Sequence, residues 1–304
     1  MLTIQILTKN NEKTIKKTLD SIKSINCDKV IIDRGSTDKT LEICSKFNNL
    51  TIHETSDLNL STIRNKFSKE INFYIHPWET LVQGHEDIQN VMEASKVYVF
   101  ENDVISKDLR IWTIEKFNNP IYETIINNNA NLLTNIIISS KDQPNNLEEK
   151  IYILNKWKKE KPFNSDVYYY LSFCGLLSKD YKSFFKNCEE YYLREKSVSS
   201  SYIMMKYYCS QVNLHLANIK KSIEDALFCI SFKPEMSEFW CLLGDIYYKQ
   251  NQYKKSKEFY ENAVIVGKKR KKDDNLPIEI KKYKEYPSKM IENIDLILKN
   301  INLY

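Results

Sequence analysis

The chain has 304 residues, of which 42% are hydrophobic and 28% charged, which is the balance of an ordinary globular protein with room for two domains. Its 5 glycines and 7 prolines are too few for a loop-rich all-β fold, and a net charge of +5 does not by itself indicate nucleic-acid binding. We interpret the basic run at 268–272 as a solvated connector, because Asp273 and Asp274 follow it; a patch facing phosphate or membrane is the alternative.

Seven cysteines are scattered along the chain without a C-x-x-C pair, which predicts buried free thiols in a reducing compartment rather than zinc ligands. Residues 2–7 already have the pattern of a strand, so we expect no signal peptide. No apolar run reaches the roughly 18 residues that a membrane span needs. These features predict a cytoplasmic protein with no membrane span.

From residue 1 to about 140, short apolar runs alternate with helical segments. The expected strands are 2–7, 30–32, 50–53, 73–75 and 97–100, with helices at 12–25, 40–47 and 61–70. This alternation predicts right-handed crossovers and a mainly parallel sheet. Two further strands, at 111–116 and 132–139, are expected at its mixed edge.

After about residue 145 the apolar period is helical throughout. The clearest unit is Trp240-x-x-Leu243-Gly244-x-x-Tyr247, which resembles the tetratricopeptide repeat. A shift of 34 residues aligns 253–256 with 219–222, and a weaker copy begins near Tyr168. The step from Tyr181 to Ile219 is 38, so we expect 197–201 to lengthen one turn.

This register makes three further predictions about the helical region. Trp240 should be buried between paired helices, and 288–303 should form a capping helix. An array of this kind presents a concave surface, so a protein or peptide partner or acceptor is expected on it.

The strongest local signal for chemistry lies at 30–40. Asp33 ends a strand, Gly35 and Ser36 follow as a tight turn, and Asp38 stands at the start of a helix. Because open α/β sheets bind ligands at the carboxyl ends of their strands, Asp33 should face a ligand crevice. Gly35 permits both the turn and the close approach of a ligand. For Asp38 a helix-capping role remains the alternative.

The whole order of landmarks resembles the inverting family-two glycosyltransferases of GT-A fold. The opening strand and turn at 7–12, the helix at 14–24, the string at 33–40 and Arg64-Asn65-Lys66 fall in the family's order, the last being similar to a motif of a subgroup that often carries tetratricopeptide repeats. The resemblance implies a Rossmann-like domain at 1–142 and a helical-repeat domain at 143–304. It also implies a nucleotide-diphosphate sugar bound by Thr8, Asn10, Glu12, Asp33, Gly35, Ser36, Asp38 and Arg64.

The chain departs from the family where acids would hold a divalent cation. It has Ile75-His76-Pro77-Trp78-Glu79 in place of the family's L-D-A-D-E pattern, which leaves His76 and Glu79 as weak candidates for manganese and disfavours magnesium. Tyr122 replaces a histidine of the subgroup, while Glu123 is retained. The resemblance makes Glu123 the candidate general base for inversion; a surface acid in a loop is the alternative.

Two functions remain open at this point. The first is a glycosyltransferase that moves a sugar from a nucleotide-diphosphate sugar to an unknown acceptor, with inversion. The second is a catalytically degenerate domain whose helical repeats act as a binding scaffold. The string from Thr8 to Asp38 favours the first, and the eroded metal motif favours the second.

Overall fold

The computed structural model describes residues 2–101, 104–113, 130–140, 147–268, 270, 276–283 and 285–301. The chain divides into two compact units, Met1–Glu160 and Lys161–Tyr304. The sequence places the domain boundary between residues 142 and 143, within the undescribed stretch 141–146. Helix α5, Leu147–Glu160, groups with the first unit.

The first unit alternates strands and helices in its opening part and then adds further strands. Its elements are β1 Leu2–Thr8, α1 Ile15–Ile22, β2 Asp28–Asp33, α2 Thr40–Cys44, β3 Leu50–Glu54, α3 Leu60–Lys66, β4 Ile71–Tyr74, β5 Glu79–Gln83, α4 His85–Gln89, β6 Ser95–Glu101, β7 Val104–Trp112, β8 Asn131–Ser140 and α5. Each expected strand and helix of this region has a counterpart, whereas β5 and α4 were not expected from the sequence.

The strands of this unit form one mixed sheet in the order β3-β2-β1-β4-β7-β6-β8-β5. Four of the seven neighbouring pairs are parallel, including the three at the β3-β2-β1-β4 end. The strand expected at 111–116 is β7, and it lies between β4 and β6 in the interior rather than at an edge. The expectation of a mainly parallel sheet is confirmed.

Helices cover both faces of the parallel half of the sheet. Ile4, Ile6 and Ile31 pack with α1 on one face, while Leu7, Val30 and Ile32 pack with Ile63 of α3 on the other. All seven residues of β1 are buried, as expected for a central parallel strand with both faces covered. The loops after β1 and β2 therefore start from strands that lie almost wholly in the core.

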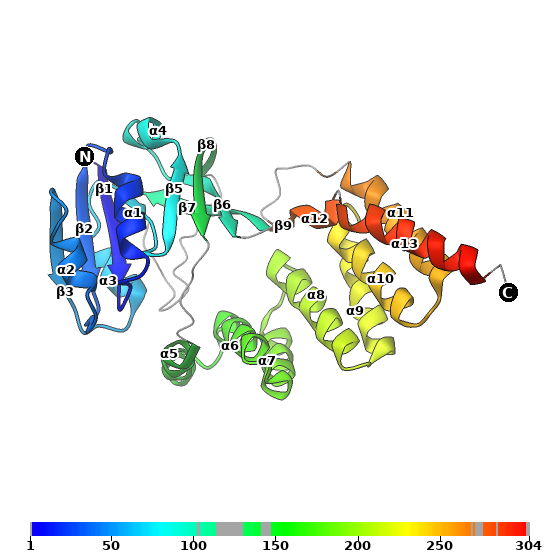
Figure 1. Ribbon diagram of the computed structural model, residues 1–304. Coiled ribbons are helices and arrows are strands. Elements are labelled where there is room, and N and C mark those ends of the chain that lie inside the picture. Colours follow the sequence, from blue (N-terminus) through cyan, green and yellow to red (C-terminus); the bar gives the residue numbers. More distant parts are fainter. Residues whose placement is uncertain are drawn as a thin grey trace. The chain divides into compact units, whose positions relative to one another are not determined.

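The second unit consists of helices arranged in successive hairpins (Figure 1). Its elements are α6 Ser165–Leu177, α7 Tyr181–Arg194, α8 Ser200–His215, α9 Ile219–Phe232, α10 Ser237–Lys249, α11 Tyr253–Gly267, the short β9 Ile278–Glu279, α12 Ile280–Tyr283 and α13 Glu285–Ile301. The expected helical region is confirmed, and its capping helix is α13, which packs against α11.

Equivalent hydrogen bonds recur from one hairpin to the next. The Ser222 hydroxyl donates to the Ser210 carbonyl at 2.8 Å, and the Ser256 hydroxyl donates to the Gly244 carbonyl at 2.8 Å. Both donor and acceptor shift by the 34 residues that the sequence predicts. Helix α8 has 16 residues against 13 in α10, so the longer repeat step comes mainly from a longer helix.

Trp240 is less buried than the repeat register predicts. Its ring is partly exposed, and its indole N–H donates to the Pro234 carbonyl at 2.7 Å. The neighbouring Phe239 is fully buried instead, packed near Tyr207. The prediction of free thiols is confirmed, since all seven cysteines are unpaired and only Cys27 is not fully buried.

Candidate functional site

The candidate crevice begins where β1 and β2 end side by side. Thr8 pairs with Asp33 in the parallel register, and the Arg34 N–H donates to the Thr8 carbonyl at 2.9 Å. Both Thr8 and Asp33 are buried, with exposed fractions of 2% and 1%. Two of the predicted site residues are therefore adjacent at the carboxyl edge of the sheet.

Asp33 holds the turn that follows it. Its Oδ2 accepts the N–H groups of Gly35 and Ser36 at 3.0 and 2.8 Å, and its Oδ1 accepts the Ser36 hydroxyl. Gly35 has φ +83°, a conformation that glycine adopts without strain, and the space beside it is open. The carboxylate is thus bound by neutral donors of its own loop, next to open space at the edge of the sheet.

The loop after β1 is tied to the loop after β2 through Asn10. Its backbone N–H donates to the Ser36 hydroxyl at 2.9 Å, and its side-chain oxygen accepts the Thr37 N–H at 2.8 Å. Asn10 has φ 54°, which asparagine tolerates better than most residues. The exposed Asn10 therefore joins the two predicted loops into one surface.

Glu12 and Asp38 form a second link between the same loops. The Glu12 N–H donates to Asp38 Oδ2 at 3.0 Å, and Glu12 Oε2 accepts the Lys39 N–H at 3.1 Å. Asp38 Oδ1 also accepts the Thr40 N–H at 3.0 Å, at the first residue of α2. Asp38 thus binds the first residue of α2, while the N-cap position itself is Lys39, which makes no side-chain cap hydrogen bond.

The hydrogen bonds to Asp38 outweigh the effect of its burial. Burial acts to raise the pKa of this carboxyl, but the Thr40 hydroxyl and the N–H groups of Glu12 and Thr40 lower it, and the net pKa is below its usual value. Asp38 is therefore ionised at neutral pH.

Arg64 lies apart from these loops, in a buried aromatic cluster. Its guanidinium carbon is 4.3 Å from the centroid of the Tyr74 ring, and Arg64 has no exposed surface. Contact with a diphosphate would require the surrounding side chains to move. Its role in nucleotide binding stays a prediction.

Glu79 is engaged by an arginine that the sequence does not single out. Arg110 donates to both carboxylate oxygens of Glu79, at 2.8 and 2.9 Å, and the backbone N–H of His76 donates to Oε2 at 2.8 Å. Both members of this ion pair are almost fully buried. The Arg110 guanidinium, like that of Arg64, lies over the Tyr74 ring.

His76 stacks on Trp78, with ring centroids 4.6 Å apart and an angle of 3° between the planes. Burial, together with the charges of Arg110 and Arg64, holds the pKa of His76 well below its usual range. The imidazole is therefore neutral at pH 7.

These residues do not fit a divalent cation as they are arranged. Both oxygens of Glu79 already accept hydrogen bonds from a guanidinium, and a cation there would meet the positive charge of Arg110. Within the described ranges, no group of three or more His, Cys, Asp and Glu side chains has metal-binding geometry. The metal assignment of His76 and Glu79 remains an untested prediction that this geometry disfavours.

Two residues that hold the loops after β1 and β2 in place, Asn11 and Glu149, were not singled out from the sequence. Asn11 is buried, its side-chain oxygen accepts the Thr8 hydroxyl at 3.0 Å, and its N–H donates to the Thr40 hydroxyl at 2.7 Å. Asn11 lies within the opening turn at 7–12, directly before Glu12, so that segment could have pointed to it. No local sequence pattern predicts that Glu149 binds Lys9 and Arg34. The candidate base Glu123, with Tyr122, lies outside the described residues.

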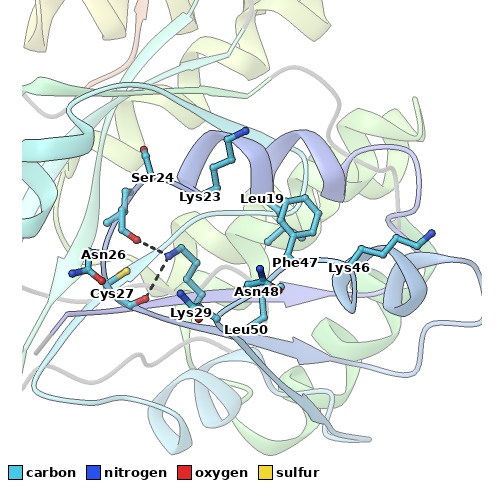
Figure 2. Close-up of a pocket in the computed structure, with 12 residues that line it drawn as sticks. Leu19, Lys23, Ser24, Asn26, Cys27, Lys29, Lys46, Phe47, Asn48 and Leu50 are labelled. Atoms are coloured by element: carbon cyan, nitrogen blue, oxygen red, sulfur yellow. Dashed lines mark hydrogen bonds between the residues drawn. The ribbon is translucent and has the colours of Figure 1, made fainter.

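A cavity of about 480 Å³ lies at the other end of these strands, beside the amino ends of β2 and β3 (Figure 2). The Lys29 ammonium turns back to the carbonyls of Ile25 and Cys27, at 2.6 and 3.4 Å. Lys23 and Lys46 extend outward without converging on one point (Figure 2). None of the residues that line this cavity belongs to the loops after β1 and β2, and its cationic groups do not build a common anion site.

Comparison with protein families gives one match in the α/β unit. Residues 3–71 match the model described as Glycosyl transferase family 2, which spans β1 to the start of β4 and includes both crevice loops. No curated protein matches the chain. Among the helices of the described part of the chain, none is long and apolar enough to cross a membrane.

Solved structures resemble the chain at low identity. The Sgt2 tetratricopeptide domain from Aspergillus fumigatus is 16% identical, with 46% of this chain and 82% of that chain covered and a TM-score of 0.37. MamA from Desulfovibrio magneticus RS-1 is 15% identical, with 51% and 88% covered and a TM-score of 0.38. TarS from S. aureus is 11% identical, with 87% and 52% covered and a TM-score of 0.38.

Residues 3–71 are therefore similar to the family-two glycosyltransferases and lie in an α/β unit, and the unit that follows is a run of paired helices with contacts that repeat after 34 residues.

Proposed function

We propose that the chain binds a nucleotide-diphosphate sugar at the carboxyl edge of β1 and β2 and transfers its sugar, with inversion, to an acceptor. The observation that supports this proposal most directly is the joining of the loops after β1 and β2, through Asn10 and through Glu12 with Asp38. Both loops lie within the segment that matches the family. Residues of both loops were expected at this place from the sequence.

The loops offer three things that recognition of a nucleotide requires. Asp33 and Asp38 supply acceptor oxygens for hydroxyl or N–H groups of the ligand, once their loop donors are exchanged or shared. The open space beside Gly35 gives the ligand close access to the backbone. Because β1 is buried on both faces, these groups are held on a rigid support.

No step of this proposal runs through a bound metal, since the residues at 76–79 do not fit one. A departing diphosphate still needs positive charge. Glu123 stays the proposed base for the acceptor hydroxyl, and the helical array is proposed to hold the acceptor or a protein partner. A cytoplasmic location belongs to the same proposal.

Titration calorimetry with a panel of nucleoside diphosphates and their sugars tests the proposal. Asp33→Ala should weaken affinity about 5- to 150-fold, because losing a buried hydrogen-bonded contact costs about 1–3 kcal/mol. Asp28→Ala is the matched control, since Asp28 is exposed at the other end of the same strand. Equal affinity in wild type and Asp33→Ala, or no binding of any nucleotide, would overturn the assignment.

A second function, a scaffold without catalysis, is favoured by the buried ion pair of Glu79 with Arg110 at the family's metal position. A scaffold function requires no nucleotide binding. The same titration therefore separates the two functions, because a pure scaffold binds none of the panel.

A further inference from the structure

Two cations lie directly at the mouth of the proposed crevice. Lys9 follows the last residue of β1, and Arg34 follows the last residue of β2. Because Thr8 and Asp33 are paired in register, Lys9 and Arg34 leave the sheet side by side. Neither was expected to contact a ligand.

Both cations bind one oxygen of a carboxylate that is distant in sequence. Glu149 Oε1 lies 3.0 Å from Lys9 Nζ and 2.8 Å from Arg34 Nη2. Glu149 belongs to the first turn of α5, within the same compact unit. An anionic oxygen shared between an ammonium and a guanidinium is the arrangement that a phosphate oxygen also adopts.

The charges leave this cluster ready for a stronger anion. Within this cluster two positive charges contact one negative charge, while the nearby carboxylates of Asp33 and Asp38 are bound by neutral donors of their own loops. Arg34 is mostly buried, with an exposed side-chain fraction of 12%, and its Nε has no hydrogen-bond partner within the described part of the chain. A buried donor without a partner is costly, so a ligand that binds it gains affinity.

Glu149 itself is held as a carboxylate. Burial acts to raise its pKa, but the hydrogen bond from Lys9 and the charge of Arg34 outweigh burial, so that its pKa lies below the usual value. At neutral pH the cluster therefore holds an internal anion.

We propose that Lys9 and Arg34 form the subsite for the diphosphate of the nucleotide sugar, and that Glu149 is an internal anion which the diphosphate displaces. The nature of the ligand rests on the proposed function, whereas the anion subsite rests on the contacts of Lys9, Arg34 and Glu149. The subsite supplies positive charge at the proposed nucleotide site. Near Glu79 the guanidinium of Arg110 is buried against that carboxylate, so its charge is not offered to a ligand.

The test is calorimetric titration of the full chain with inorganic pyrophosphate in the presence of chelator. Glu149→Gln should bind pyrophosphate about tenfold more tightly than wild type, because the competing charge is removed while the side-chain shape is kept. Adding Arg34→Gln to Glu149→Gln should abolish that gain. Glu42→Gln is the matched control, since Glu42 forms an exposed pair with Lys46, and it should leave the affinity within about twofold.

A merely structural role of Glu149 predicts the opposite sign. If Glu149 only held Lys9 and Arg34 in place, Glu149→Gln would weaken pyrophosphate binding, and that result overturns the subsite. Equal affinity in wild type and Glu149→Gln, or a gain in Glu149→Gln that survives Arg34→Gln, overturns it as well.

The failure of the subsite and the failure of the proposed function give different results. A nucleoside diphosphate that binds in an Asp33-dependent manner, with no effect of Arg34→Gln, leaves the function standing and removes the subsite. Arg34-dependent pyrophosphate binding in a chain that binds no nucleotide keeps the subsite and removes the function.

Discussion

Asp33 and Asp38, at the carboxyl edge of β1 and β2, are held by neutral hydroxyl and N–H donors, whereas Glu79, at the start of β5, is held by the guanidinium of Arg110. Neutral donors on a loop can be shared with or exchanged for those of a ligand at modest cost. A buried ion pair cannot lose one partner without leaving a charge unpaired in the interior. The first region can therefore exchange its hydrogen-bond partners at lower cost than the second, which agrees with the proposed binding role of Asp33 and Asp38.

The largest effect should follow from breaking the buried ion pair. Arg110→Met leaves Glu79 charged and without its guanidinium, and should lower the free energy of unfolding by about 3–5 kcal/mol. Denaturant unfolding measures this value. Combining Arg110→Met with Glu79→Leu should recover most of the loss, because no buried charge remains. A loss below about 1 kcal/mol in the single variant would show that the pair is not structural.

Asp33→Ala should have a smaller effect on stability than Arg110→Met. It removes an acceptor of three hydrogen bonds from neutral donors in one turn, so we expect a loss of about 1–3 kcal/mol. Denaturant unfolding of both variants under one set of conditions makes the comparison. If Asp33→Ala is the more destabilising of the two, the contrast between the regions is wrong.

His76 should make stability depend on pH. Its pKa in the folded chain lies below its pKa in the unfolded chain, so its contribution is complete above about pH 6.5 and declines as the pH falls below that value. The slope is at most about 1.4 kcal/mol per pH unit. Wild type should therefore lose stability between pH 6.5 and 5.5 more steeply than His76→Phe, which keeps an aromatic ring on Trp78. Identical slopes would mean that His76 is not held neutral.

The smallest effect on stability is expected at Glu149. Its ion pairs are partly exposed, with 23% of the side chain accessible, so Glu149→Gln should cost at most about 1 kcal/mol at pH 7. Because the folded pKa is lowered, this contribution is present above about pH 4.5 and disappears as the pH falls below it. Thermal unfolding at pH 7 and pH 3.5 gives the comparison. A larger loss at the lower pH would contradict the assigned charge state.

Much of the fold could be predicted because its signals are local. Period and spacing predict the parallel half of the sheet, and the 34-residue shift aligns Ser256 with Ser222, whose hydroxyls make equivalent bonds in the structure. The interior place of β7 could not be predicted, since antiparallel pairing with β4 and β6 leaves no mark in the spacing of its residues.

The residues of the candidate site likewise differ in whether their contacts are local in the sequence. Asp33, Gly35 and Ser36 form one local turn, so their sequence string is sufficient to predict it. Arg110 lies 31 residues from Glu79, and Glu149 lies 115 residues from Arg34, so neither partner could be predicted without the fold. Trp240 shows the limit of a repeat register, which predicted the helix but not how far each ring is covered.

The central claim is that the carboxyl edge of β1 and β2 binds a nucleoside diphosphate without an acid-held metal. The most direct measurement is calorimetric titration of the wild-type chain with the panel of nucleoside diphosphates and their sugars, first in excess chelator and then with added magnesium. We expect binding that survives chelator and is weakened by Asp33→Ala. A strict magnesium requirement, or affinity that Asp33→Ala leaves unchanged, would contradict it.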